Sequence, residues 1–154
     1  MPQISPFTIW QLAPSDAALF QGLLAMFGAA FEDVETYLGA PPSTVYREHL
    51  LASGQFIALA VLKHGEVIGG LAAYELKKFE RERSELYIYD LAVAAPHRRQ
   101  GVATALISRL KLIARQRGAH VIFIQADFGD APATALYTKL GVREDVLHFD
   151  IDPN

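Results

Sequence analysis

The chain has 154 residues, of which 51% are hydrophobic and 20% charged, and its formal net charge is −3. This length and composition predict one ordinary folded domain, residues 1–154, and exclude a disordered chain. The sequence contains no cysteine, which excludes disulfides, thiolate metal ligands and a covalent intermediate on a cysteine.

The histidines and the hydropathy pattern narrow the class of protein further. Five histidines are scattered along the chain without the i, i+4 pair of a zinc-binding helix, so we expect no metal site. No apolar run approaches the roughly 18 residues of a membrane span. The polar start MPQISP lacks the basic end and apolar stretch of a signal peptide. We therefore expect a soluble, cytoplasmic protein.

The first part of the chain predicts one strand and two helices. Residues 7–12 are expected to form a strand, and Pro14 and Asp16 mark the first turn of a helix. Residues 32–42 are expected to form a loop, followed by a short second helix over residues 43–51. The apolar residues of the first helix recur at helical spacing and indicate a face packed on the core: Leu19, Phe20, Leu23, Leu24, Phe27 and Phe31.

The middle of the chain predicts three antiparallel strands. Residues 56–62 and 67–76 form two apolar segments joined by the turn Lys63-His64-Gly65-Glu66, which is typical of a hairpin. A polar segment, residues 77–84, then leads by another reversal into a central strand over residues 86–93.

Asp90 departs from the pattern of the central strand. Strict alternation places its carboxylate on the same face as Leu86, Ile88 and Ala92, where an unpaired charge is costly. Either a β-bulge turns Asp90 away so that it bonds to the backbone, or Asp90 meets a cationic ligand. We favour the ligand, because the end of this strand is expected to lie beside a crevice.

The segment after the central strand combines a glycine turn with a helix. Apolar residues Val102, Leu106, Leu110 and Ile113 recur at helical spacing. Gly101 lies where the first unpaired helix amides emerge, and these amides favour a phosphate or pyrophosphate. Six basic residues and no acidic residue lie between positions 97 and 117 in a net acidic chain, so the local field also favours an anion.

The last third of the chain predicts a strand, a helix and a strand. Gly118 is placed to end the preceding helix, and residues 121–126 form a nearly continuous apolar strand that should pair in parallel with the central strand. The carboxyl ends of such strands leave a ligand crevice. Asp130 and Gly141 should bound a helix over residues 131–140. A final strand over residues 146–151 would leave an open sheet edge that a second copy of the chain, as a homodimer, could complete.

Two motifs resemble those of one family, the GNAT N-acetyltransferases. The family's Q/R-x-x-G-x-G/A loop matches residues 98–103, RRQGVA, and its A-x-x-x-Y-x-K-x-G helix is similar to residues 133–141, which include ALYTKLG. The resemblance implies an α/β (α+β) acyl-CoA N-acyltransferase fold, with a mixed, mostly antiparallel sheet, a central parallel pair of strands and flanking helices. It also implies acetyl-CoA as the cofactor.

The resemblance assigns the cofactor to two parts of the chain. The loop would hold the pyrophosphate, the strand before it would pair its backbone with the pantetheine arm, and the later helix would approach the thioester. The implied cofactor-binding residues are Leu91, Ala92, Val93, Arg98, Arg99, Gln100, Gly101, Val102, Ala103, Thr104, Asp127, Ala133, Leu136 and Tyr137.

Tyr137 and Asp90 are the candidate catalytic residues. Without the family resemblance, Tyr137 is more simply explained as a tyrosine that packs one face of a short helix. With it, the phenol is expected to donate a proton to the leaving sulfur. Asp90 could bind the acceptor's ammonium and take a proton from it. Backbone amides near Leu91 and Ala92 would polarise the thioester carbonyl, which requires a break in strand pairing.

The resemblance extends to one branch of the family, the aminoglycoside 3-N-acetyltransferases of the gentamicin-resistance class (type I). The runs RSELYIYDLAV, HRRQGVATALI, QADFGD and HFDIDP carry it. It implies a polycationic aminoglycoside substrate, with the loop of residues 32–42 as one wall of the acceptor pocket. The candidate substrate-binding residues are Glu85, Tyr89, Asp90, Asp127 and Asp150.

Three alternatives remain at this point. The acceptor could be another amine, such as a polyamine or a protein N-terminus, because the acceptor pocket varies within one fold. The chain could also be a non-catalytic acyl-CoA sensor. A nucleic-acid binder is the weakest alternative, because the net charge is −3 and no known binding motif is present.

Overall fold

The computed structural model describes residues 6–154, and their contacts divide the chain into two compact units, one that ends at Ile124 and one formed by Gln125–Asn154. The second unit contains α5 (Ala131–Leu140). In chain order, the first unit contains β1 (Thr8–Gln11), α1 (Ala17–Ala30), α2 (Val34–Leu38), α3 (Thr44–Ala52), β2 (Phe56–Lys63), β3 (Glu66–Lys77), β4 (Ser84–Val93), the 3-10 turn η1 (Ala95–His97), α4 (Val102–Arg117) and β5 (Ala119–Ile124).

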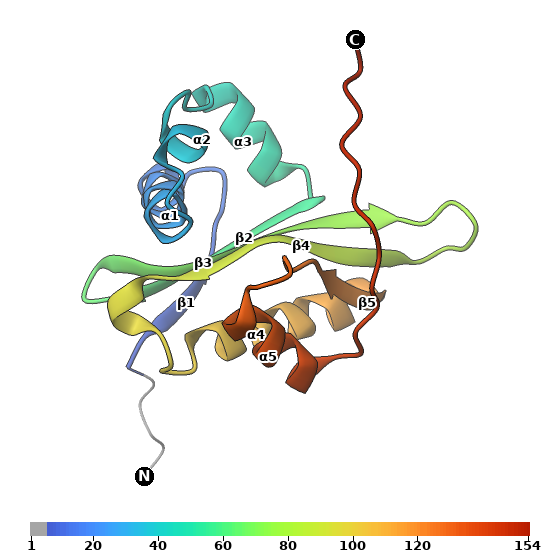
Figure 1. Ribbon diagram of the computed structural model, residues 1–154. Coiled ribbons are helices and arrows are strands. Elements are labelled where there is room, and N and C mark those ends of the chain that lie inside the picture. The colour runs from blue at the N-terminus through green and yellow to red at the C-terminus, as the bar shows by residue number, and fades with distance from the viewer. Residues whose placement is uncertain (1–5) are drawn as a thin grey trace. The chain divides into compact units, whose positions relative to one another are not determined.

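The first unit is built on one mixed sheet. Its strand order is β1-β2-β3-β4-β5, with antiparallel neighbours from β1 to β4 and a parallel β4–β5 pair joined through α4. Helices α1, α2 and α3 cover one face of the sheet and α4 covers the other (Figure 1). The expected mixed sheet with one parallel pair and flanking helices is therefore confirmed.

Strand β2 lies at the centre of the core because both faces of the sheet are covered. Its residues Ile57 to Val61 are almost completely buried. Ala58 and Ala60 belong to a buried cluster with Leu23 and Phe27 of α1. Burial of these apolar side chains supplies the main driving force that brings helices and sheet together.

Two adjacent glycines in β3 let the helices approach the sheet. A Cβ on Gly70 would overlap the Leu23 side chain of α1, and a Cβ on Gly69 would lie 2.9 Å from Val102 Cγ1 at the start of α4. Since neighbouring residues in a strand point to opposite faces, this glycine pair sets the depth of α1 and of α4. Val102 is only 2% exposed, so the first residue of α4 is anchored against the sheet.

The segment between α1 and α3 differs from the expectation of a loop. It contains α2, a five-residue helix whose N-cap Asp33 accepts a hydrogen bond from the Thr36 amide at 3.2 Å. Gly28 of α1 allows this helix to pack closely, because a Cβ there would lie 3.4 Å from the Cβ of Tyr37. A helix this short depends on such packing and has little stability of its own, so the sequence pattern alone did not reveal it.

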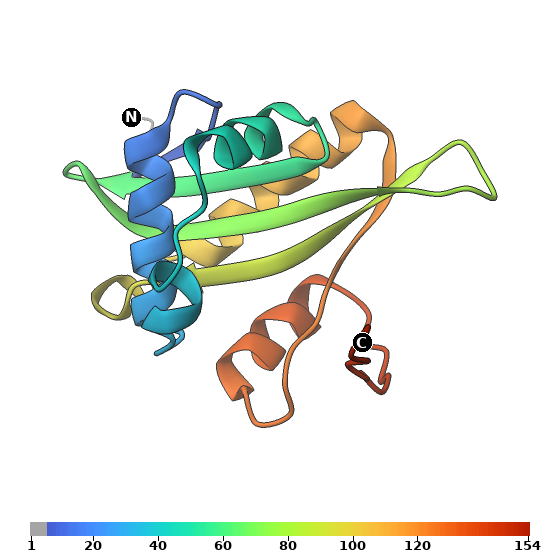
Figure 2. The ribbon, with the colours of Figure 1, turned by 90° about the horizontal axis from the view of Figure 1, so that it is seen from above.

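The expected hairpin and crossover strand are confirmed, with small shifts in their bounds. His64 and Gly65 have φ angles of 51° and 80° in the β2–β3 turn, as a tight hairpin requires. The β3–β4 connection projects away from the rest of the first unit (Figure 2). Strand β5 starts two residues earlier than expected, and its edge position leaves Val121 40% exposed.

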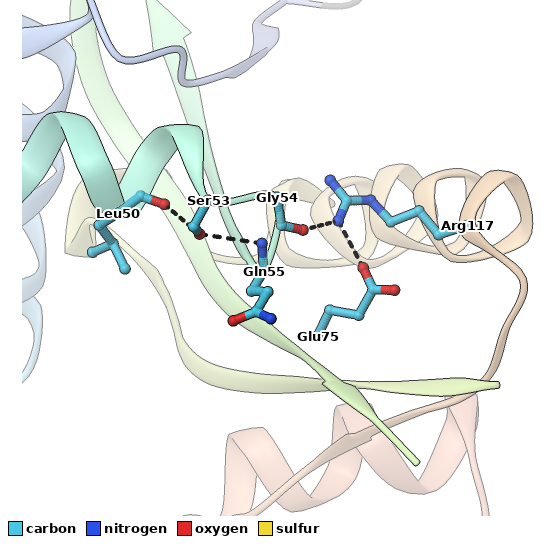
Figure 3. Close-up of polar contacts among 6 residues, drawn as sticks. All are labelled: Leu50, Ser53, Gly54, Gln55, Glu75 and Arg117. Carbon is cyan, nitrogen blue, oxygen red and sulfur yellow. Dashed lines mark hydrogen bonds and ion pairs between the residues drawn. The ribbon is translucent and has the colours of Figure 1, made fainter. Parts of the chain in front are cut away.

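A polar cluster fixes the end of α4 to the sheet. The Arg117 guanidinium donates to the Gly54 carbonyl and, at 2.7 Å, to Glu75 of β3 (Figure 3). Ser53 Oγ donates to the Leu50 carbonyl at 2.8 Å and accepts from the Gln55 amide at 3.2 Å, which shapes the turn before β2. These contacts tie α4 to the ends of α3, β2 and β3.

The second unit confirms one expected element and corrects another. Helix α5 has the expected bounds, with Asp130 as its N-cap and Gly141 directly after it. The expected strand over residues 146–151 is wrong: these residues form no strand, and Leu147, Phe149 and Ile151 are 76–87% exposed. The alternation of apolar and polar residues over positions 146–151 favours an extended backbone. A strand also needs a neighbouring strand to complete its hydrogen bonds, and none of the strands within residues 6–154 supplies one. No helix in this described part of the chain is long and apolar enough to cross a membrane.

Candidate active site

The loop between β4 and α4 presents an uncapped helix N-terminus. Gly101, the N-cap of α4, has φ 79° and no side chain to accept from the first amides. In contrast, the N-caps of α2, α3 and α5 are Asp33, Ser43 and Asp130, and each side chain accepts from an amide of its own helix. The amides of Val102 to Thr104 thus receive no N-cap side chain, which suits a bound anion at the positive end of the helix dipole.

The basic side chains of this loop are partly fixed by backbone contacts. Arg98 Nε donates to the Val93 carbonyl at 3.1 Å, and Gln100 Nε2 approaches the Pro96 carbonyl at 3.5 Å. Arg99 is exposed and has φ 60°, a left-handed conformation that turns the chain sharply before Gly101. The loop can therefore surround an anion with both amides and guanidinium groups.

The end of β4 leaves one edge of the sheet open. On one side, Leu91, Ala92 and Val93 pair with β3. On the other side, the ladder with β5 stops at the pair Ile88 and Ile124, so residues 91–93 have no strand partner there within residues 6–154. An extended ligand arm could pair with this edge, next to the anion-binding loop. The residues present therefore fit a pyrophosphate joined to a pantetheine arm.

A β-bulge in β4 determines where Asp90 points. Asp90 pairs with Ala72 and Ile88 pairs with Ala73, so Tyr89 is an extra residue in β4. Ala72 packs against the α1 cluster, so Asp90 lies on the face covered by α1 to α3, opposite to Ile88. The expectation from strict alternation, which placed Asp90 and Ile88 on one face, is therefore wrong, because the bulge reverses the alternation.

The Asp90 carboxylate interacts electrostatically with the Tyr37 side chain of α2. Partial burial raises the pKa of Asp90 above its usual range, and the interaction with the Tyr37 hydroxyl opposes this rise. Burial also raises the pKa of Tyr37, Tyr74 and Tyr87, and the Asp90 charge adds to each rise.

Asp90 therefore lies in a group of tyrosines that we call the tyrosine cluster: Tyr37, Tyr74, Tyr87 and Tyr89. Tyr89 is 63% exposed and meets Tyr74 and Tyr87 edge-on, with ring centroids 6.0 and 5.7 Å apart. Within residues 6–154, Asp90 forms no ion pair with a basic side chain. A carboxylate beside aromatic faces is suited to bind an ammonium group.

In the second unit, Tyr137 is a protonated phenol on α5. Burial, with a smaller contribution from the Asp130 charge, raises the pKa of Tyr137 to about 12. The phenol therefore keeps its proton at neutral pH and can donate it. Asp130 also accepts from the Ala133 amide at 3.2 Å, so that amide already has a partner. Leu136 is partly buried beside Tyr137 in the sequence.

The surroundings of the other candidate carboxylates differ from those of Asp90. Glu85 lies at the opposite end of β4, where His120 and Lys78 approach it at 3.2 and 3.6 Å. Asp127 is exposed before α5, and Asp150 pairs with His148 at 2.9 Å. Within residues 6–154, Glu85 and Asp150 each have a basic partner, whereas Asp90 forms no ion pair.

Sequence reasoning missed the part that Tyr37 plays beside Asp90. Residues 32–42 were expected to line an acceptor pocket, but no local pattern pointed to this tyrosine.

A groove of about 470 Å³ lies between α1 and η1, lined by residues that include Met26, Val67 and Arg98. It contains neither Asp90 nor the first amides of α4, so we locate the site by the chemistry of its side chains and not by this groove.

Comparisons with known proteins agree with this geometry. The family model described as Acetyltransferase (GNAT) family matches residues 19–142. An aminoglycoside acetyltransferase from an uncultured soil metagenomic sample has a structure 60% identical in sequence, with a TM-score of 0.95, that covers 98% of this chain and 100% of its own. A second such enzyme, in complex with sisomicin, is 29% identical, with a TM-score of 0.88 and 97% of each chain covered.

Curated relatives are more distant. N-acetyltransferase 8F1 of Rattus norvegicus is 29% identical over 77% of this chain and 52% of its own length. The chain thus spans about half the length of the curated relatives it matches. With a family model that covers most of its length, the chain belongs to the acetyltransferase (GNAT) family, whose enzymes take the acetyl group from acetyl-CoA.

Proposed function

We propose that this chain transfers an acetyl group from acetyl-CoA directly to an aminoglycoside, at the 3-amino group of the deoxystreptamine ring of gentamicin-type antibiotics. The observation that carries the proposal is the partly buried Asp90 carboxylate, which lies near several tyrosines and forms no ion pair within residues 6–154. The 60% identity to an aminoglycoside acetyltransferase over nearly the whole chain supports the substrate class. The choice of the 3-amino group and of gentamicin rests on the sequence resemblance.

Binding of acetyl-CoA is assigned to the first unit and to α5. The amides of Val102 to Thr104, together with Arg98 and Arg99, would bind the pyrophosphate. The open edge of residues 91–93 would pair with the pantetheine arm, and the family resemblance adds Asp127, Ala133 and Leu136. Acetyl-CoA supplies the activated acetyl group.

The proton transfers are assigned to two side chains. An ammonium group must lose a proton before its nitrogen forms the new C–N bond, and the leaving sulfur must gain one as the C–S bond breaks. Asp90 would hold the ammonium and accept its proton, directly or through water. Tyr137 would donate to the sulfur, since its phenol is protonated at neutral pH. The family resemblance adds Glu85, Tyr89, Asp127 and Asp150 as contacts of the polycationic acceptor.

The position of acetylation is tested on the product. Purified protein would be incubated with acetyl-CoA and gentamicin, and the acetylated product analysed by two-dimensional NMR. We expect one acetyl group on the 3-nitrogen of the deoxystreptamine ring. Acetylation of a different nitrogen would retain an aminoglycoside acetyltransferase and remove the 3-amino assignment.

A further inference from the structure

Four aromatic side chains form one row across the sheet of the first unit. In the strand register, Tyr74 of β3 pairs with Phe56 of β2 and with Tyr87 of β4. Tyr87 pairs in turn with Phe123 of β5. Residues paired across neighbouring strands point to the same face of a sheet, so the four rings share one face. We call this set the aromatic row: Phe56, Tyr74, Tyr87 and Phe123.

The rings of the aromatic row are in contact from strand to strand. The ring centroids of Phe56 and Tyr74 are 5.2 Å apart. Tyr87 stacks on Phe123 with centroids 4.6 Å apart and an angle of 3° between the ring planes. Tyr89, the extra residue of the bulge, connects these two pairs, because its centroid lies 6.0 Å from that of Tyr74 and 5.7 Å from that of Tyr87. The row and Tyr89 therefore form one connected aromatic surface.

This surface lies on the same face of the sheet as Asp90 and is partly exposed. Tyr74 is two residues from Ala72, the partner of Asp90, so the row and Asp90 are about 7 Å apart along the strands. Tyr74 is 37% exposed and Tyr89 is 63% exposed. Helices α1 to α3 leave the ends of β3 and β4 next to their connection uncovered (Figure 2). A ligand can therefore reach aromatic rings and a carboxylate side by side.

Structural packing explains only part of this arrangement. Cross-strand aromatic pairs stabilise a sheet, which accounts for the stacked Tyr87 and Phe123. Tyr89 is different, because its ring is mostly exposed and its residue interrupts the regular pairing with β3. Bulges of this kind often occur next to binding sites, where they redirect a side chain.

The chemistry of an aromatic surface beside a carboxylate fits an amino sugar. The face of an aromatic ring carries partial negative charge, which attracts partly positive hydrogens and ammonium groups. A sugar ring presents C–H bonds on its face and carries its hydroxyl and ammonium groups at its rim. Such a ring can stack on the aromatic surface while an ammonium group on a linked ring reaches Asp90.

We propose that the aromatic row, together with Tyr89, is a stacking platform for one ring of the acceptor, while Asp90 holds an ammonium group of the neighbouring ring. The inference rests on the proposed function and adds a second subsite to its acceptor site. The platform predicts that the protein selects a multi-ring amino sugar over a single-ring amine or a linear polyamine.

Tyr74→Leu and Tyr89→Leu each remove one aromatic face and keep an apolar side chain. Binding would be measured with coenzyme A present, which permits no acetyl transfer, by calorimetry for gentamicin and by NMR titration for the single-ring amine 2-deoxystreptamine. We expect each variant to weaken gentamicin binding about three- to tenfold, the contribution of one aromatic contact, and to leave 2-deoxystreptamine binding unchanged. Tyr74→Phe keeps the ring and should restore wild-type affinity for gentamicin.

Trp10→Leu is the matched control. Trp10 is 52% exposed on β1 and pairs with Ala60, four residues along β2 from the row's Phe56. We expect this variant to bind gentamicin as the wild type does. Because Tyr89 is mostly exposed, Tyr89→Leu should also keep the wild-type melting temperature, so it tests the platform even where Tyr74→Leu lowers stability.

The outcomes separate this inference from the proposed function. Unchanged gentamicin affinity in both leucine variants, with gentamicin acetylated by the wild type, would overturn the platform and leave the proposed function standing. Equal losses for gentamicin and 2-deoxystreptamine would also overturn the platform, because they would indicate damage around Asp90. A loss confined to gentamicin, in a protein that acetylates no aminoglycoside, would support the platform and overturn the proposed function. No gentamicin binding by the wild type would overturn both.

Discussion

At the scale of single residues, Asp90 differs from Glu75 and Glu85, two other carboxylates on β3 and β4. Glu75 is paired with Arg117, and Glu85 with His120 and Lys78, whereas Asp90 interacts with a phenol. A buried charge without an opposite charge costs folding free energy. Such a cost is expected where a ligand supplies the missing cation, since functional sites often retain groups that do not favour stability.

Asp90→Asn keeps the size of the side chain and removes its charge. Steady-state kinetics should show that kcat/KM for gentamicin falls about a hundredfold or more, as expected for loss of a proton acceptor. Because the pKa of Asp90 is raised in the fold, its ionised form costs stability at neutral pH, and the cost is relieved as pH falls through the folded-state pKa. The melting temperature of the variant at pH 7 should therefore equal or exceed that of the wild type. Full activity in this variant would make Asp90 a structural residue only.

Tyr137→Phe tests the proton donor. Stopped-time assays at saturating substrates should show kcat reduced roughly ten- to a hundredfold, because the leaving sulfur loses its donor. The dissociation constant for acetyl-CoA, measured by calorimetry, should be unchanged. With the pKa of Tyr137 at about 12, the wild-type rate should not fall through ionisation of this phenol anywhere below about pH 10. An unchanged kcat in the variant would remove Tyr137 from the mechanism.

At the scale of elements, Gly101 at the N-terminus of α4 has a left-handed backbone conformation and no side chain that could cap the helix. Gly101→Asp and Gly101→Asn form a matched pair, because both side chains tolerate a positive φ better than most and only one is charged. We expect Asp to abolish measurable acetyl-CoA binding in calorimetry, through repulsion of the pyrophosphate and occupation of the amides. The Asn variant should retain weaker binding. Equal affinities in the two variants would contradict an anion site at this helix end.

The opposite end of α4 is held by Arg117. Arg117→Met should lower the free energy of unfolding by about 1–3 kcal/mol in a urea titration, because Glu75 and the Gly54 carbonyl lose a partly buried partner. Arg115→Met, at an exposed position two residues earlier, is the control and should change stability by less than about 0.5 kcal/mol. A similar loss in both variants would mean that the polar cluster of Figure 3 contributes nothing specific.

Most elements could be predicted because their signals are local. Helical spacing predicted α1 and α4, the turn signals before residue 43 predicted α3, Asp130 and Gly141 predicted α5, and apolar runs predicted β2 to β5. Helix α2 and the missing strand at residues 146–151 could not be predicted, because one depends on packing against Gly28 and the other on a neighbouring strand. The bulge at Tyr89 is likewise visible only in the pairing with β3. It decides the face of Asp90, and so the contact with Tyr37 lay beyond the sequence pattern.

At the scale of the whole molecule, the proposed cofactor side and the proposed acceptor side differ in charge. The loop and helix of residues 97–117 are basic in a chain of net charge −3, whereas Asp90 of the proposed acceptor side forms no ion pair within residues 6–154. This separation suits an anionic cofactor and a polycationic acceptor, because each is attracted by the opposite field. The expected homodimer stays a prediction. Exposed apolar residues near the C-terminus and the half-exposed edge strand β5 are compatible with it.

The most direct measurement is the rate of thiol release from acetyl-CoA by the purified chain with a panel of acceptors. The panel contains gentamicin, an aminoglycoside that lacks a free 3-amine, spermidine and a peptide with a free N-terminus. We predict rapid release with gentamicin and only background release with the other three. Release with spermidine or the peptide alone would contradict the aminoglycoside assignment, and no release despite measurable acetyl-CoA binding would indicate an acyl-CoA sensor.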